Sequence, residues 1–198
     1  MKNQWDNRYS TEEYVYGTEP NEFFCECMKM LEPGKLLLPG EGEGRNATWA
    51  AQMSWVVDAF DQSTAGQKKA LRLAKSRGAK FNYQIKRVEQ FKSEPSSYDT
   101  AALIFLHLSQ PLRSTFHHAV AESIKPGGHL IIEAFSQKQY GYNSGGPKDI
   151  QQLYTKDSML NDFPNFDFEI CHEIEVNLRE GNVHSGKASV LRLFGKKV

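Results

Sequence analysis

Three glycines at alternate positions, Gly40, Gly42 and Gly44, form the stretch of this chain most suited to chemistry. They follow the apolar run 36–38 and precede a predicted helix at about 46–53. A strand, a glycine turn and a helix form a unit with which α/β sheets bind nucleotide-like ligands, because glycine lets a ligand lie against bare backbone. A glycine-rich surface turn is the alternative, since three glycines alone are a weak signal.

Asp61 stands 17 positions after Gly44, where the predicted strand 55–60 should end. A carboxylate at that point can accept hydrogen bonds from both hydroxyls of an adenosine ribose. Asp58 is a competing candidate, but we expect it inside the strand in a structural polar contact. Capping of the next helix is the alternative role for Asp61.

Two ligands suit this arrangement, and the loop sequence distinguishes them. A dinucleotide needs the pattern G-x-G-x-x-G or A. Counted from Gly40 the pattern fails at Arg45, whereas counted from Gly42 it ends at Ala47 and formally fits. The two glutamates of the loop would place negative charge beside a pyrophosphate. The positively charged sulfonium and ammonium groups of S-adenosylmethionine would tolerate them.

The rest of the chain predicts elements that can position these residues. Further strands are expected at 81–85, 101–106 and 130–135, with helices at 20–31, 63–76, 111–124 and 149–161. Regular alternation of strands and helices favours a parallel sheet with right-handed crossovers. Two extended runs, 166–180 and 187–194, predict an antiparallel hairpin that closes one sheet edge. The expected fold is α/β: a doubly wound, mostly parallel, Rossmann-like sheet of about seven strands with an antiparallel C-terminal hairpin.

Length and composition limit the function classes. The 198 residues suit a single domain, 1–198, and the equal counts of basic and acidic residues, 24 each, give no overall field that would attract nucleic acid. No apolar run is long enough to span a membrane, and the N-terminus lacks the apolar core of a signal peptide. Three cysteines read as reduced thiols of a cytoplasmic protein. Cys25 and Cys27 have no second pair nearby, so no metal site is expected.

The order of motifs resembles a class I S-adenosylmethionine-dependent methyltransferase over nearly the whole chain. Within this class, the chain is similar to the small group related to tellurite-resistance and thiopurine methyltransferases. The motifs that carry the resemblance are Trp5, Arg8-Tyr9, 17–21, the loop 40–46, 59–63, Tyr98-Asp99, 125–128 and 145–148.

The resemblance implies a set of cofactor contacts. The loop 40–42 would lie against the methionine part, Asp61 would hold the ribose, and residues 87–88 would border the adenine. Residues 104, 105 and 107 would face the methionine and the acceptor, while residues 16–17 would close over the cofactor. The expected cofactor-binding residues are Tyr16, Gly17, Gly40, Glu41, Gly42, Asp61, Gln62, Arg87, Val88, Ile104 and Phe105.

The chain departs from the family pattern at the start of the loop. The family usually has an acidic residue two positions before the first glycine, where this chain has Leu38, and Pro39 replaces a small aliphatic residue. We hypothesise that Glu41 supplies the missing charge.

The resemblance predicts S-adenosylmethionine-dependent methyl transfer to a small-molecule acceptor by in-line displacement. Segment 1–19 is expected to cap the site, and segment 136–148 to form a loop over it. His107 is the candidate base, with a strand-end histidine bonded to backbone as the alternative. Two other functions stay open: a non-catalytic domain that binds S-adenosylmethionine or S-adenosylhomocysteine, and a nicotinamide-dependent oxidoreductase.

Overall fold

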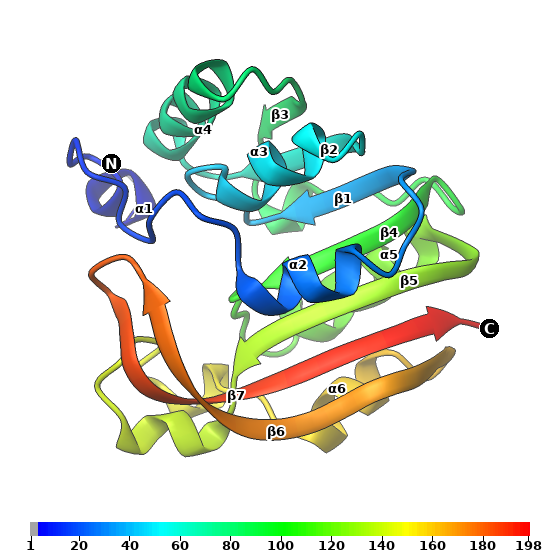
Figure 1. The fold of residues 1–198 in the computed structure, drawn as a ribbon. Helices are drawn as coiled ribbons and strands as arrows, with labels where there is room; N and C mark the ends of the chain where they lie inside the picture. The colour runs from blue at the N-terminus through cyan, green and yellow to red at the C-terminus, as the bar shows by residue number, and fades with distance from the viewer. Residues whose placement is uncertain (1–3) are drawn as a thin grey trace.

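A computed structural model describes residues 4–198, which fold around one seven-stranded sheet (Figure 1). The strand order is β3-β2-β1-β4-β5-β7-β6. The first five strands pair in parallel, and β7 runs antiparallel to both β5 and β6. The predicted sheet and its antiparallel hairpin are therefore confirmed. The strands are β1 (Lys35–Pro39), β2 (Val56–Asp61), β3 (Asn82–Ile85), β4 (Tyr98–Ile104), β5 (Ile124–Phe135), β6 (Phe166–Glu180) and β7 (His184–Lys197).

Helices cover both faces of the sheet, as a doubly wound fold requires. Apolar residues of α2, α3 and α4 pack with one face, and those of α5 and α6 pack with the other. Figure 1 shows α2 lying across the first of these faces. The helices are α1 (Gln4–Arg8), α2 (Glu22–Met28), α3 (Arg45–Gln52), α4 (Thr64–Ser76), α5 (Leu112–Ser123) and α6 (Lys156–Asp162), with short 3-10 turns at Val88–Gln90, Gln137–Gly141 and Ile150–Gln152.

The strand order creates a crevice next to β1. The chain leaves β1 toward β2 on one side, and it later returns to β4 on the other side. Connections that diverge from neighbouring strands open a crevice at the carboxyl ends of those strands, which is where open α/β sheets bind ligands. The glycine loop follows β1 and therefore lies at this point.

Three local expectations differ from the structure. Residues 125–128 do not form a separate turn but belong to β5, where Gly127 has a left-handed φ of 78° and the β4–β5 register shifts. The helix expected at 149–161 is a 3-10 turn followed by the shorter α6. Strand β4 ends at Ile104, because Phe105 turns the chain with a φ of 52°.

The β6–β7 hairpin is long enough to reach the N-terminal segment. Its tip curls up beside the loop that follows α1 (Figure 1). The amide of Asn182 donates to the Val15 carbonyl at 3.2 Å. A Cβ on Gly181 would lie 2.2 Å from that carbonyl oxygen, so only glycine allows this approach. The hairpin tip and the N-terminal segment are thus joined by direct backbone contact.

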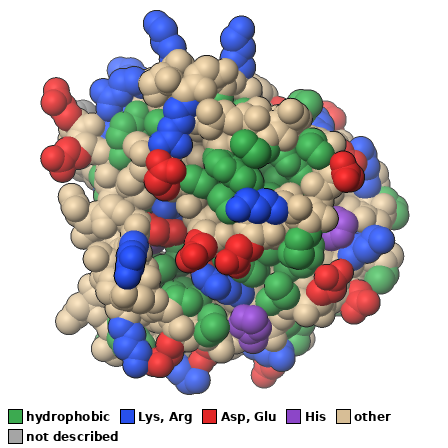
Figure 2. All heavy atoms as spheres, in the orientation of Figure 1, with side chains coloured by type: hydrophobic (Ala, Val, Ile, Leu, Met, Phe, Trp, Pro, Cys, Tyr) green, Lys and Arg blue, Asp and Glu red, His purple; other side chains and the backbone are tan. Residues whose placement is uncertain are grey.

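Acidic and basic side chains are interspersed on the face drawn in Figure 2, with no large area of one sign. None of the helices within residues 4–198 is long and apolar enough to cross a membrane.

Candidate active site

The glycine loop turns through three left-handed positions. Gly40, Gly42 and Gly44 have φ values of 65°, 58° and 84°, which side chains with a Cβ rarely adopt. A Cβ on Gly44 would lie 2.5 Å from the Cβ of Ala70, so this glycine also lets the start of α3 pack against α4. The amide of Glu41 donates to the Phe60 carbonyl at 3.2 Å, which ties the loop to the end of β2.

Asp61 is buried at the end of β2, facing the loop. Its Oδ1 accepts from the Ser63 amide at 2.8 Å, and its Oδ2 accepts from the Gly42 amide at 3.2 Å. Each carboxylate oxygen has a second lone pair, so the side chain can still accept two hydroxyl hydrogen bonds. Burial raises the pKa of Asp61 to about 6 against the effect of these amides, which leaves it mostly ionised at neutral pH.

Glu41 is also buried, and it caps α3. Its Oε1 accepts from the Ala47 amide at 2.8 Å. Burial raises the pKa of Glu41 to about 7, while this amide and the Arg45 guanidinium favour the ionised form. The amides that begin a helix are the groups that would hold a pyrophosphate. Since Glu41 already occupies one of them, the loop is poorly suited to a dinucleotide.

A cavity of about 560 Å³ lies at the carboxyl ends of β1, β2 and β4. Its volume is in the range of small-molecule sites. All but one of the expected site residues line it: Tyr16, Gly17, Gly40, Glu41, Asp61, Gln62, Arg87, Val88, Ile104, Phe105 and His107. Residues from five separate stretches of the chain therefore meet here, as the resemblance implies.

Gly42 lies behind the cavity wall instead of on it. Its amide donates to Asp61, and its carbonyl accepts from the Tyr83 hydroxyl at 2.6 Å. A Cβ at this position would lie 2.6 Å from the Tyr9 hydroxyl. Gly42 thus fixes the position of Asp61 from behind the cavity wall.

His107 lines the cavity, but both of its ring nitrogens are bonded to backbone. Nδ1 lies 2.7 Å from the Gln152 carbonyl oxygen, and Nε2 accepts from the Phe135 amide at 3.1 Å. Burial lowers the pKa of His107 to about 4. With no nitrogen free to take a proton, His107 is unsuited to the role of base, and its geometry fits the alternative of a strand-end histidine that holds backbone.

The N-terminal segment contributes residues to the cavity wall, and buried polar groups hold it there. Glu43 accepts from the Val15 amide at 2.9 Å, and Lys69 lies 2.5 Å from the other oxygen of the same carboxylate. Asp6 accepts from the Ser63 hydroxyl at 2.7 Å, at the start of α4. The expected cap was 1–19, and its first three residues lie outside the described ones. From this segment, Tyr9 and Tyr16 turn their rings into the cavity wall.

The glycine-rich loop expected over the site at 136–148 contributes Gly146, Pro147 and Lys148 to the cavity wall. A Cβ on Gly146 would lie 2.9 Å from the Phe135 ring, so this backbone packs directly on an aromatic side chain. The loop is held by Gln139, which donates to the Gly145 carbonyl at 3.0 Å.

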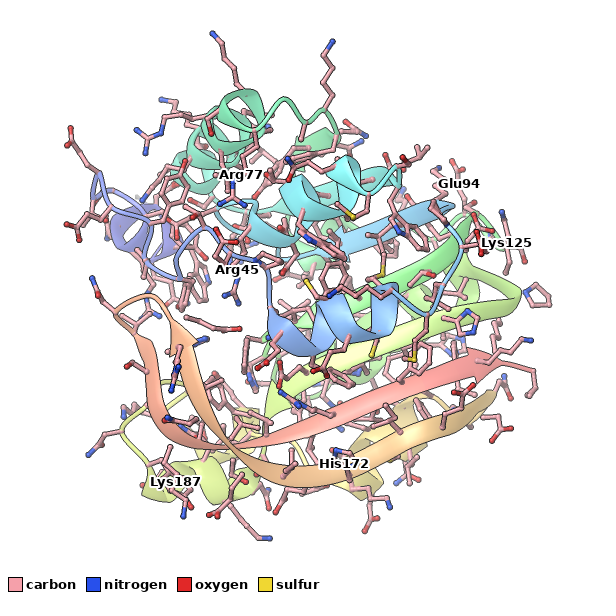
Figure 3. The ribbon with its side chains drawn as sticks, in the orientation of Figure 1. Arg45, Arg77, Glu94, Lys125, His172 and Lys187 are labelled. Atoms are coloured by element: carbon pink, nitrogen blue, oxygen red, sulfur yellow. The ribbon has the colours of Figure 1, made fainter. Side chains whose placement is uncertain are left out.

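Three polar residues of the cavity region, two of them buried, were not expected from the sequence. Arg45, at the start of α3, pairs with Glu180 of the hairpin at 2.9 Å. His184, the first residue of β7, lies 3.3 Å from the same carboxylate and lines the cavity. Figure 3 shows Arg45 on the side of α3 that faces the hairpin tip. The glycine after Glu180 marked a turn in the sequence, but no local pattern places that turn against the loop.

Comparisons with known proteins agree with this geometry. Residues 37–128 match a family model described as a methyltransferase domain. No curated protein is similar enough in sequence to count as a relative.

Solved structures share the fold at low identity. A structure concerned with conversion of a disulfide bond into a thioacetal group during echinomycin biosynthesis has a TM-score of 0.79 at 14% identity, covering 98% of this chain and 91% of that chain. TehB from Haemophilus influenzae has a TM-score of 0.73 at 14% identity, covering 98% and 66%. The 1,6-didemethyltoxoflavin-N1-methyltransferase of Burkholderia thailandensis, with bound 1,6-didemethyltoxoflavin and S-adenosylhomocysteine, has a TM-score of 0.66 at 16% identity, covering 98% and 83%.

Residues 37–128 match a methyltransferase domain, and the seven-stranded sheet with its crevice at β1 is the fold of the S-adenosylmethionine-dependent methyltransferases among the similar solved structures. The similarity to TehB is a similarity of fold.

Proposed function

We propose that this protein is an S-adenosylmethionine-dependent methyltransferase that acts on a small-molecule acceptor and that its whole chain works as one domain. The observation that supports this most is the cavity itself, which is walled on one side by the glycine loop and Asp61 and covered by the N-terminal segment and the hairpin. A cavity of about 560 Å³ under two covers suits a small acceptor better than a folded macromolecule. The Burkholderia thailandensis enzyme, with a small heterocycle bound, supports the same class of acceptor.

The residues present fit S-adenosylmethionine, which supplies an activated methyl group when bound. Asp61 and Gln62 would hold the ribose, and Val88 and Arg87 would border the adenine. Backbone of Gly40 would lie against the methionine part, because its left-handed turn leaves no Cβ in the way. Glu41 offers a buried carboxylate at the cavity wall, suited to a cationic ligand. The rings of Tyr16 and Phe105 can favour a sulfonium as they favour an ammonium.

In this proposal the protein accelerates the reaction by aligning the acceptor with the methyl group. A covered cavity excludes water and holds the acceptor in line with the methyl group, and orientation of this kind can contribute about 7–11 kcal/mol to a rate at best. Two ion pairs hold the N-terminal segment and the hairpin in place, Glu43 with Lys69 and Arg45 with Glu180. This supports a preformed site.

We also propose a cytoplasmic location and no nucleic-acid partner. The three cysteines are free in the structure, and burial raises the thiol pKa of Cys25 to about 11 and of Cys27 to about 12. Such thiols are poorly reactive and read as structural side chains.

Calorimetric titration with S-adenosylmethionine, S-adenosylhomocysteine and NAD tests the ligand class. We expect the two adenosyl compounds to bind and NAD not to bind. Turnover with S-adenosylmethionine should then be measured over a panel of thiols, phenols, aromatic amines and chalcogen oxyanions. Binding without turnover on any of them would favour a non-catalytic binding domain, and NAD binding would contradict the proposal.

A further inference from the structure

We propose that His184, oriented by Glu180, accepts the proton of the methyl acceptor, and that the acceptor is a small planar molecule whose attacking oxygen, sulfur or nitrogen carries that proton. This inference rests on the methyltransferase function proposed above. It adds a proton-accepting residue from the far end of the chain and a chemical class for the acceptor.

The first observation is the hydrogen-bond pattern of His184. Its Nδ1 lies 3.3 Å from Oε2 of Glu180, and its ring lines the cavity. Among residues 4–198, no side chain or backbone group bonds to its Nε2. A carboxylate at Nδ1 places the ring proton on that nitrogen, because a carboxylate only accepts. Nε2 then carries the lone pair that can receive a proton.

Glu180 is built to stay ionised in this position. Burial would raise its pKa, but hydrogen bonds from His184, Arg45 and Asn21 outweigh burial and lower the pKa to about 2. Arg45 Nη2 lies 2.9 Å from Oε2, and Asn21 Nδ2 donates to Oε1 at 2.8 Å. An ionised carboxylate beside Nδ1 stabilises the imidazolium that forms when Nε2 takes a proton.

Charged and titratable groups from every neighbouring element support a neutral resting ring. Burial lowers the pKa of His184 below its usual value, and Arg45 of α3 and Arg8 of α1 lower it further against the pull of Glu180. Tyr16 and His107 are the other titratable groups near the ring, and both are uncharged at neutral pH. The ring is therefore ready to accept a proton near pH 7.

Aromatic side chains surround the His184 ring and indicate the shape of the acceptor. The centroids of Tyr16, Phe105 and Phe135 lie 4.5, 4.6 and 5.1 Å from the His184 ring. All three line the cavity. Phe105 holds its place through a left-handed φ of 52°, a strained conformation of the kind that is common at functional sites. Flat faces at this end of the cavity suit a planar acceptor.

The step balances with these groups alone. The acceptor heteroatom uses a lone pair to form its bond to the methyl carbon, while the carbon–sulfur bond breaks and its electron pair stays on sulfur. The heteroatom loses its proton to Nε2 of His184, and Glu180 compensates the new positive charge. Release of that proton to water restores the ring.

The first test reads the protein without any ligand. Proton–nitrogen NMR correlation spectra of the histidine side chains distinguish the two neutral tautomers from the cation. We expect His184 to be neutral at pH 7 with its proton on Nδ1, and His184→Asn assigns its signals. A cationic ring, or a proton on Nε2, would overturn the proposal.

The second test compares His184→Asn with wild type on paired acceptors of one ring, a phenol that keeps its proton and a thiophenol that is ionised at the assay pH. An asparagine amide can replace Nδ1 as donor to Glu180 but has no counterpart of Nε2. We expect kcat for the phenol to fall about 100-fold or more and kcat for the thiophenolate to stay close to wild type. Equal losses on both acceptors, or no loss on either, would overturn the proposal.

Two controls separate this inference from the function on which it rests. S-adenosylhomocysteine should bind wild type and His184→Asn with similar affinity. If the wild-type protein does not bind S-adenosylhomocysteine, the result counts against the proposed function and not against the role of His184. His118→Asn, on the exposed side of α5, should leave kcat for both acceptors unchanged. Gly145→Ala is a second variant: its Cβ would lie 2.6 Å from Cδ2 of His184, so it should also lower kcat for the phenol selectively.

Discussion

Glu41 lies in the glycine loop, caps α3 and lines the cavity, and its burial raises its pKa into the neutral range. The carboxyl caps α3 through the Ala47 amide and has a pKa raised to about 7 by burial. A cation placed beside it would favour the ionised form and so release a proton. This gives physical content to the hypothesis that Glu41 replaces the acidic residue missing at Leu38.

The charge of Glu41 predicts a pH-dependent preference for a cationic ligand. The ratio of S-adenosylmethionine to S-adenosylhomocysteine affinity should rise by up to roughly 10-fold between about pH 6 and about pH 8, as the carboxyl ionises. Calorimetry at several pH values measures the ratio. In Glu41→Gln the ratio should be independent of pH, and an unchanged slope in that variant would dismiss the charge role.

Asp61 and Asp58 lie on the same strand but should behave differently. Asp61 lines the cavity, whereas Asp58 pairs with Lys35 and accepts from the Tyr98 hydroxyl away from it. Hydrogen bonds to a charged group contribute about 1.5–3 kcal/mol. Asp61→Asn should therefore weaken S-adenosylhomocysteine binding roughly 10- to 100-fold. Asp58→Asn is the matched control, and equal losses in the two variants would refute the assignment.

At the scale of elements, the β6–β7 hairpin joins the far edge of the sheet to the glycine loop. Its buried contact with α3 runs through Glu180 and Arg45, while Lys187 on β7 points to solvent (Figure 3). Asn21 also donates to Glu133 of β5, which pairs with Arg192 of β7 at 2.8 Å. These contacts couple the position of the hairpin tip to the sheet core.

The hairpin contact predicts a large difference between two glutamates of β6. Glu180→Ala leaves the buried Arg45 charge without its carboxylate partner, which should lower the free energy of unfolding by about 3–5 kcal/mol. Glu175 pairs with Lys187, and both side chains are more than half exposed, at 54% and 62%. Glu175→Ala should therefore change stability by about 1 kcal/mol or less in the same urea titration. Similar effects of the two substitutions would show that the hairpin tip is not held as described.

At the scale of the whole molecule, ligand binding should stabilise the fold. A ligand at about 100 times its Kd adds about 2.7 kcal/mol to the free energy of unfolding. For a chain of this size, S-adenosylhomocysteine at that excess should raise the melting temperature by about 5–10 °C. NAD at the same concentration should leave the melting temperature unchanged. Equal shifts of the melting temperature with the two ligands would contradict this expectation.

The sequence predicted well the parts of the fold that depend on local pattern. Strand periodicity and glycine spacing were enough to predict the strand before Gly40 and the carboxylate at the end of β2. These two features could be placed side by side because parallel strands bring their carboxyl ends together.

What the sequence could not predict depends on long-range register. Glu180 and His184 reach Arg45 only because the hairpin pairs over its full length and curls back, and a one-residue slip would turn these side chains to the other face. His107 shows the same limit, since its two backbone partners come from β5 and from a later loop. Neither contact has a signal in the residues around position 107.

We propose above that the glycine loop and Asp61 hold an adenosyl ligand at the carboxyl ends of β1 and β2. A crystal structure of the protein with S-adenosylhomocysteine tests it most directly. The ligand should lie against Gly40, with both ribose hydroxyls within hydrogen-bond distance of the Asp61 carboxylate. A ligand bound elsewhere, or a ribose that makes no contact with Asp61, would contradict it.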